Sequence, residues 1–122
     1  MELNQFQIVG ALAQSPRPAT TQNGTQILEL VLENQASDGY NGAAPKTETI
    51  SVNLTGDFRA YQNLKPGQVL LVAGTLGGTM ATSQNGQYCK IRLRPKSITI
   101  LPYERPLATP IQQGDGYGLY GA

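Results

Sequence analysis

The chain has 122 residues and a formal net charge of +1. This length is enough for one domain with a hydrophobic core. It contains no histidine and one cysteine, which excludes an internal disulfide, histidine acid–base chemistry and zinc or haem sites built on histidine or cysteine clusters. No segment resembles a signal peptide or reaches the ~20 apolar residues of a membrane span, so we expect a cytoplasmic protein.

The first half of the chain alternates apolar and polar residues with the period of strands. We expect strands over about Asn4–Leu12, Thr25–Asn34 and Thr47–Leu54, with a turn at Gln22-Asn23-Gly24 before the second. The connection Ala36–Lys46 is long and polar, and a loop of that length is typically functional or disordered.

The next segment predicts a short helix and a central strand. Asp57 is placed to cap a helix over Phe58–Leu64, in which Phe58 and Tyr61 are expected to pack on the sheet. The strand Gln68–Leu76 is apolar on both faces near its middle, and Gly77-Gly78 is expected to break it. A hairpin follows, because Asn85-Gly86 is the strongest short hairpin signal.

The strand after this hairpin is basic. No acidic residue lies between Asp57 and Glu104, so the formal charge is −4 up to Asp57, +6 from Phe58 to Tyr103 and −1 beyond. Over Tyr88–Lys96 the residues alternate strictly, which predicts one apolar and one cationic face. The apolar parity is carried by Cys89, Ile91 and Leu93, and we expect Cys89 in the core. The parity flips at Pro95, which indicates a β-bulge.

The residues after position 101 lose this periodicity and are rich in proline and glycine. We therefore expect a domain over residues 1–101 and a flexible tail over 102–122. Five strands with one short helix between strands 3 and 4 is the order of the OB-fold. We predict an all-β, five-stranded OB-fold Greek-key barrel.

Several segments, in this order and spacing, make the chain similar to bacterial-type single-stranded-DNA-binding proteins. The segments are Asn4–Leu12, Ser15-Pro16, Gln22-Asn23-Gly24, Leu64–Leu76 and Asn85-Gly86. The replication-restart protein PriB has a related barrel and is a close second match.

The resemblance implies sequence-tolerant binding of single-stranded DNA in replication, recombination or repair, by a homodimer or homotetramer in the bacterial nucleoid. In the family, strand 1 pairs across a dimer interface, and the outer residues Val9, Ile27 and Val31 fit a covered surface. Replication or repair proteins are further expected partners, and no membrane and no cofactor is implied.

The chain departs from the family in its aromatic residues. The family stacks bases on tryptophans, whereas this chain has none, and the matching positions fall near Tyr40, Thr49 and Met80. Each stacked base contributes roughly 1–3 kcal/mol, so binding is expected to depend more on charge and on salt. The chain also ends without the family's acidic tip, which fits a truncated domain or a member that does not recruit partners in that way.

The candidate nucleic-acid-binding residues combine the basic strand with residues of the loops and of strand 3. They are Arg17, Tyr40, Lys46, Thr49, Met80, Tyr88, Lys90, Arg92 and Arg94. Tyr88 fits base stacking and cross-strand packing equally well. We identify no catalytic, metal or cofactor residues.

Two functions from different classes remain open. The first is a non-enzymatic binder of single-stranded DNA. The alternative is a PriB-like interaction module of the replication-restart machinery with weak DNA affinity, which the missing tryptophans favour. The simplest interpretation of the cationic strand face, without any ligand, is a solvated outer face.

Overall fold

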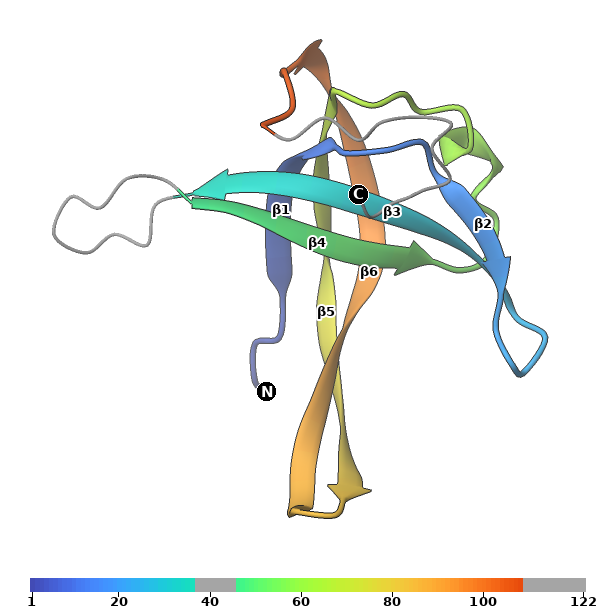
Figure 1. The fold of residues 1–122 in the computed structure, drawn as a ribbon, viewed down its shortest axis with the longest axis vertical. Coiled ribbons are helices and arrows are strands. Elements are labelled where there is room, and N and C mark those ends of the chain that lie inside the picture. The colour runs from blue at the N-terminus through green and yellow to red at the C-terminus, as the bar shows by residue number, and fades with distance from the viewer. Residues whose placement is uncertain (37–45, 109–122) are drawn as a thin grey trace, which may run out of the picture.

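The computed structural model describes residues 1–36 and 46–108 and folds them into a six-stranded antiparallel sheet (Figure 1). The elements in chain order are β1 (Phe6–Leu12), β2 (Arg17–Thr20), β3 (Gln26–Ala36), β4 (Lys46–Leu54), the 3-10 helix η1 (Arg59–Tyr61), β5 (Gln68–Ser83) and β6 (Gly86–Glu104). The prediction of an all-β fold is confirmed. The number of strands differs from the prediction, because β2 is additional.

The sheet curls into an open barrel around β3. One edge of β3 pairs with β2 and then with β1, and its other edge pairs with β4. From β1 the sheet continues to β5 and β6. Within the described residues β4 and β6 do not pair, so the barrel is open between them. A cavity of about 110 Å³ marks this opening, lined by Leu54, Thr55, Tyr61, Pro95, Lys96, Ser97 and Ile98.

The core is formed by the inward-facing parity of the strands. The largest fully buried side chains are Leu12, Leu28, Leu30, Leu32, Val52, Leu70 and Val72. Alternation at every second residue places all of them on the concave side of the curled sheet. Burying a leucine or valine side chain contributes roughly 1.5–3 kcal/mol, so this cluster supplies most of the driving force for folding.

The predicted helix over Phe58–Leu64 shortens to the three residues of η1. So short a connection leaves no room to repay the cost of helix nucleation. Phe58 and Leu64 flank η1 and are buried in the core cluster, and Tyr61 packs against it. The predicted packing of Phe58 and Tyr61 on the barrel is therefore confirmed.

Strand β2 lies in a segment where the sequence predicts a loop. It pairs with the first half of β3, from Arg17 opposite Glu29 to Thr20 opposite Gln26. All four of its residues are exposed and one is proline, so neither alternation nor composition marks it as a strand. The turn to β3 contains Gly24 at φ +83°, as the Asn-Gly signal predicts.

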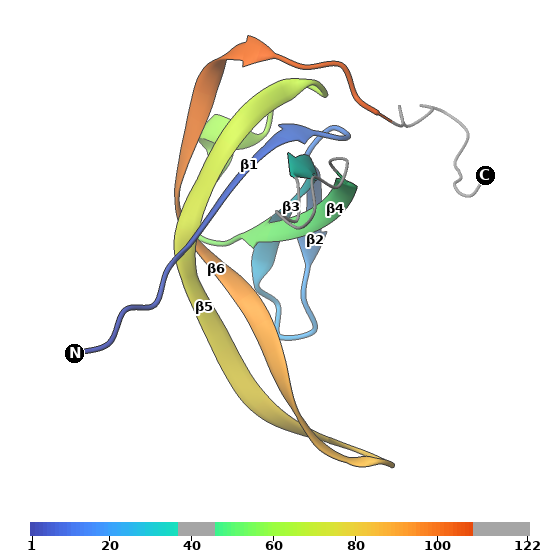
Figure 2. The ribbon, with the colours of Figure 1, turned by 90° about the vertical axis from the view of Figure 1, so that its left-hand side faces the viewer.

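Strands β5 and β6 extend well beyond the barrel as a two-stranded arm, which points downward in Figures 1 and 2. The predicted break at Gly77-Gly78 is wrong: β5 passes through both glycines, which pair with Arg92 and Ile91 of β6. The arm ends at the predicted hairpin, where Gly86 has φ +119°. Glycine weakens a strand but does not stop it when the ladder continues on both sides.

The arm also overturns the expected burial of Cys89. Cys89 is exposed, and Ile91 has 63% of its surface accessible. Leu93, nearer the barrel, is the member of this parity that packs against the core. The alternating pattern is real, but on the hairpin side of Leu93 the sheet has left the barrel and both of its faces meet solvent.

A β-bulge separates the arm from the barrel, as the parity flip at Pro95 predicts. Gly74 pairs with Pro95 and Ala73 with Ser97, which leaves Lys96 as the extra residue. The strands approach closely here, because a Cβ on Gly74 would lie 2.0 Å from the carbonyl oxygen of Arg94. The bulge lets Leu93 and Ile98, an odd number of residues apart, both face the core.

The chain beyond residue 101 begins with structure rather than with a tail. Strand β6 runs to Glu104, and Arg105 then reaches Glu33 of β3, which is 4% exposed. Arg105 Nη1 lies 3.0 Å from Glu33 Oε1, its Nη2 donates to the Glu33 carbonyl at 2.6 Å, and the Ala108 N–H donates to Oε1 at 2.8 Å. The carboxylate therefore anchors residues 105–108. Residues 109–122, the rest of the expected tail, lie outside the described residues.

We predict that Gly74→Ala destabilises the fold. The new Cβ would meet backbone atoms of Arg94 and Pro95, which move only if the bulge itself moves. We expect the free energy of unfolding to fall by about 1–3 kcal/mol, measured by urea denaturation. Gly78→Ala is the matched control, since its nearest neighbour would be the Cys89 sulfur at 3.5 Å. Equal stability of the two variants would contradict the tight approach at the bulge.

We also predict that the Cys89 thiol reacts with Ellman's reagent in the folded protein, because the arm leaves it exposed. One thiol per chain should react without denaturant. A Cys89→Ser/Val72→Cys variant is the control, since position 72 is fully buried and its thiol should react only on unfolding. Protection of Cys89 to the same degree would mean that the arm is covered.

Candidate nucleic-acid interface

The arm carries a row of cationic side chains on one face. We call Tyr88, Lys90, Arg92 and Arg94 of β6 the basic row, since they alternate along the strand and therefore share a face. The β5 residues opposite them are Ala81, Thr79, Gly77 and Thr75, in that order. These partners are small and uncharged, so they do not cover the four longer side chains of β6. All four are exposed, and Tyr88 is 48% accessible.

The basic row has no carboxylate to neutralise it. No acidic residue lies between positions 57 and 104, and within the described part of the chain none of its cations forms a salt bridge. A group of unpaired cations attracts anions more strongly than the same charges in ion pairs do. The arm therefore presents a local positive potential that the net charge of +1 conceals.

The arginines outside the arm are paired. Arg17 forms a salt bridge with Glu29, whose other oxygen accepts a hydrogen bond from Ser51 at 2.8 Å. Arg59 holds Asp57 with two side-chain bonds of 3.1 Å, and these bonds lower the pKa of the Asp57 carboxyl below its ordinary value. Arg105 is engaged by Glu33. The prediction that Arg17 contacts DNA remains untested, but its charge is already compensated.

The remaining candidates do not join the basic row. Lys46 and Thr49 both belong to β4, where Lys46 is the first residue and Thr49 pairs with Glu33 of β3. Both are exposed, on the part of the sheet formed by β3 and β4. Met80 is in the arm but on its other face, opposite Cys89, and is 65% accessible. Tyr40 lies outside the described residues. The structure thus gathers four of the nine predicted residues into one row and places Met80 on the opposite face.

This opposite face of the arm is apolar. It consists of Leu76, Gly78 and Met80 of β5 with Cys89, Ile91 and Leu93 of β6, which face one another in register. It continues the parity of the barrel interior past the point where the core ends. The sequence pattern predicted this face but not its exposure, since alternation separates two faces without saying what covers either one.

The β5 residues beneath the basic row, Gly77 among them, were not predicted from the sequence. The signal was available, because a two-residue Asn-Gly turn sets the register of the whole hairpin. Counting back from the pair Ser83–Gly86 places Gly77 opposite Arg92 and Thr75 opposite Arg94, as observed. The expected break at Gly77-Gly78 concealed this relation.

The base of the arm is tied to the N-terminal segment by Asn4. Its side-chain nitrogen donates to the Leu76 carbonyl at 2.9 Å, and its oxygen accepts from the Leu76 N–H at 2.8 Å. The amide thus imitates one more residue of β1 pairing with β5. This contact lies before the start of β1 at Phe6 and adds support at the base of the arm.

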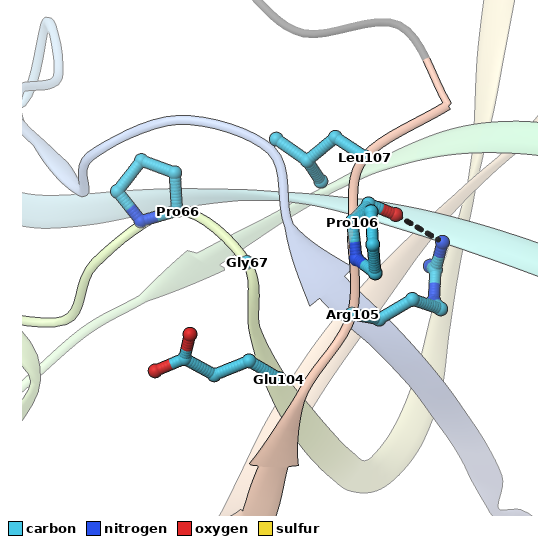
Figure 3. Close-up of a pocket in the computed structure, with 6 residues that line it drawn as sticks. All are labelled: Pro66, Gly67, Glu104, Arg105, Pro106 and Leu107. Atoms are coloured by element: carbon cyan, nitrogen blue, oxygen red, sulfur yellow. Dashed lines mark hydrogen bonds between the residues drawn. The ribbon is translucent and has the colours of Figure 1, made fainter.

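The rest of the described chain offers fewer side chains that could bind a ligand. Residues 1–36 and 46–108 contain no group of three or more His, Cys, Asp or Glu side chains placed to hold a metal ion. A pocket of about 420 Å³ lies near Glu104, at the end of β6 opposite to the hairpin (Figure 3). Arg105 at its wall is directed back onto the Pro106 carbonyl and onto Glu33. Among the described residues there is also no helix long and apolar enough to cross a membrane.

Solved structures with the same fold include single-stranded-DNA-binding proteins from several sources. A Plasmodium falciparum SSB in complex with ssDNA is 15% identical at a TM-score of 0.55, covering 83% of this chain and 96% of that one. A deletion mutant of the single-stranded DNA binding protein from Thermus aquaticus is 24% identical at 0.61, covering 81% of this chain and 50% of that one. A mitochondrial single-stranded DNA binding protein from S. cerevisiae is 17% identical at 0.61, covering 84% and 99%.

At these low identities the structural similarities show the fold alone, and they confirm the predicted OB-fold. The match covers half of the Thermus aquaticus deletion mutant. No curated protein matches the sequence. The model of the Single-strand binding protein family, however, matches residues 3–94, which is well over half of the chain and includes the basic row. The chain therefore belongs to the Single-strand binding protein family.

Proposed function

We propose that this protein binds single-stranded DNA with little regard to base sequence and without catalysis, in replication, recombination or repair. Membership of the Single-strand binding protein family supports DNA binding in general. The observation that carries the proposal for this chain is the basic row, with three unpaired cations and one aromatic ring on a strand that projects from the barrel. Phosphates would meet the cations, and Tyr88 lies where a base could stack on it.

The same surface indicates how the affinity is divided. The chain has no tryptophan, so the large stacking platforms typical of sequence-tolerant binders are absent. The affinity must then rest more on counterion release, which falls steeply with salt. Tyr40, Lys46, Thr49 and Met80 remain proposed contacts, and they lie away from the basic row or outside the described residues.

A second candidate is the PriB-like interaction module, in which DNA affinity is weak and the arm docks on a protein. The exposed apolar face of the arm favours it, because Met80 and Ile91 are 65% and 63% accessible. The two functions differ in how tightly the isolated protein holds single-stranded DNA at low salt.

We predict that the protein binds oligo-dT and that the affinity falls steeply as salt rises. In the Lys90→Ala/Arg92→Ala variant the affinity should drop, because two cations no longer neutralise phosphates. The slope of log K against log salt should then become shallower by about 1.4. Fluorescence anisotropy over a salt series measures both quantities. Arg94 is left intact in this variant.

The matched control is Arg59→Ala/Lys65→Ala, which also removes one arginine and one lysine, but at positions away from the arm. It should leave both affinity and slope nearly unchanged. Equal effects of the two variants would mean that only net charge matters and that the basic row is an ordinary solvated face. A flat titration of the wild type at low salt would rule out DNA binding and favour the interaction module.

We further propose that the protein is a homodimer or homotetramer in the bacterial cytoplasm, with β1 at the interface. β1 pairs with β5 over Phe6–Ala11 but meets β3 only at Ala11 and Leu12. No strand of the described chain pairs with its other edge before Ala11, although Val9 O accepts from the Asn34 side chain at 2.8 Å. An edge of this kind is suited to pairing with the same edge of a second copy.

We predict that Gln7→Pro weakens this association. Val9 O points away from β5, so the backbone groups of Gln7, two residues earlier, point to the same edge. Proline would remove the N–H there while leaving the β1–β5 ladder intact. Light scattering should show a lower mass, and Gln7→Ala, which retains the N–H, should match the wild type. A wild type that is monomeric, or a Gln7→Pro variant of unchanged mass, would contradict the proposed interface.

A further inference from the structure

Arg94 differs from the other cations of the basic row because its guanidinium is folded onto the sheet. A Cβ on Gly77 would lie 2.5 Å from Arg94 Nε, 2.7 Å from Cζ and 2.7 Å from one terminal nitrogen. Nε, Cζ and the terminal nitrogen define the plane of the guanidinium. No point within this plane lies at these three distances from the three atoms. A Cβ on Gly77 would therefore lie over the flat face of the guanidinium, so Gly77 faces this plane rather than its edge.

Glycine is required for this arrangement. Gly77 is buried although it sits in an exposed arm, and any side chain would occupy the space of the guanidinium. The neighbouring Gly78 shows the contrast, since a Cβ there would meet nothing closer than 3.5 Å. The side chain of Arg94 runs diagonally across the ladder, because its direct partner is Thr75 and that of Gly77 is Arg92.

The other face of the guanidinium is free. Arg94 is exposed, and among the described residues its side chain takes part in no hydrogen bond or ion pair. A planar cation supported on one side and open on the other can stack on the face of an aromatic ring. Nucleobases stack on arginine planes in this way in complexes with single-stranded nucleic acids.

We infer that Arg94, supported by Gly77, is a stacking platform for a nucleobase, in addition to carrying charge. This rests on the proposed binding of single-stranded DNA and assigns a different role to one member of the basic row. Lys90 contacts phosphates through charge alone, whereas Arg94 contacts a base through its flat face. Such a platform supplies stacking at a site where the chain has no tryptophan.

The test separates the plane from the charge. Arg94→Lys keeps the charge and removes the plane, while Gly77→Ala keeps Arg94 and displaces its guanidinium. The probes are oligo-dT and an oligonucleotide of equal length made of abasic sites. We expect both variants to bind oligo-dT about fivefold more weakly or worse, with an unchanged salt slope, and to bind the abasic strand like the wild type. The double variant should lose no more than either single one, because both remove one interaction.

Gly78→Ala is the matched control and should bind both probes like the wild type. Gly77→Ala displaces only the end of a flexible side chain, so the fold should persist, and Arg94→Lys carries the test if it does not. The inference is overturned if Arg94→Lys binds oligo-dT as the wild type does, or loses the same factor on both probes, which would make Arg94 a phosphate contact. If the wild type does not bind oligo-dT, the proposed function itself fails, which is a distinguishable result.

Discussion

The pairing of β5 with β6 is the constraint on which the candidate interface depends. The Asn85-Gly86 turn sets the register, and the ladder keeps it from Ser83 to Gly74 without a shift. The bulge at Lys96 then changes the parity once, so the residues before and after it can both serve the barrel. Because the pleat has period two, a slip of one residue would turn the basic row toward the barrel side and the apolar face outward.

The distribution of partners matters as much as the distribution of charge. Arg17, Arg59 and Arg105 each face a carboxylate, whereas the cations of the arm face threonine and glycine. Glu33 shows the stronger form of this rule: it is buried, and it is held by Arg105 and by the Ala108 N–H. Pairing elsewhere leaves the arm as the main source of positive potential, which is why a chain of net charge +1 can present a surface suited to phosphates.

The sequence predicted the parts of the fold that depend on local periodicity. Leu28, Leu30 and Leu32 are buried as their alternation indicates, the Asn-Gly turn is formed, and the parity flip at Pro95 corresponds to the bulge. Prediction failed where an element depends on the strand that it pairs with rather than on its own residues. β2 exists because β3 offers it an edge, and β5 crosses Gly77-Gly78 because β6 continues beside it. For the site, the basic row was predicted in full, while Gly77 was missed.

The amino-acid sequence alone therefore specified which residues share a face of β6 and that the parity changes at Pro95. It could do so because side-chain direction in a strand follows from its period of two residues. Tertiary structure decided what each face meets. Cys89 has the parity of a core residue but is exposed, since the barrel ends before the strand does. Arg17 has the charge of a DNA contact but is held by Glu29, twelve residues away. Arg94 lies flat on Gly77 because the hairpin brings these residues together, and burial and contact are properties of that assembly, not of any local pattern.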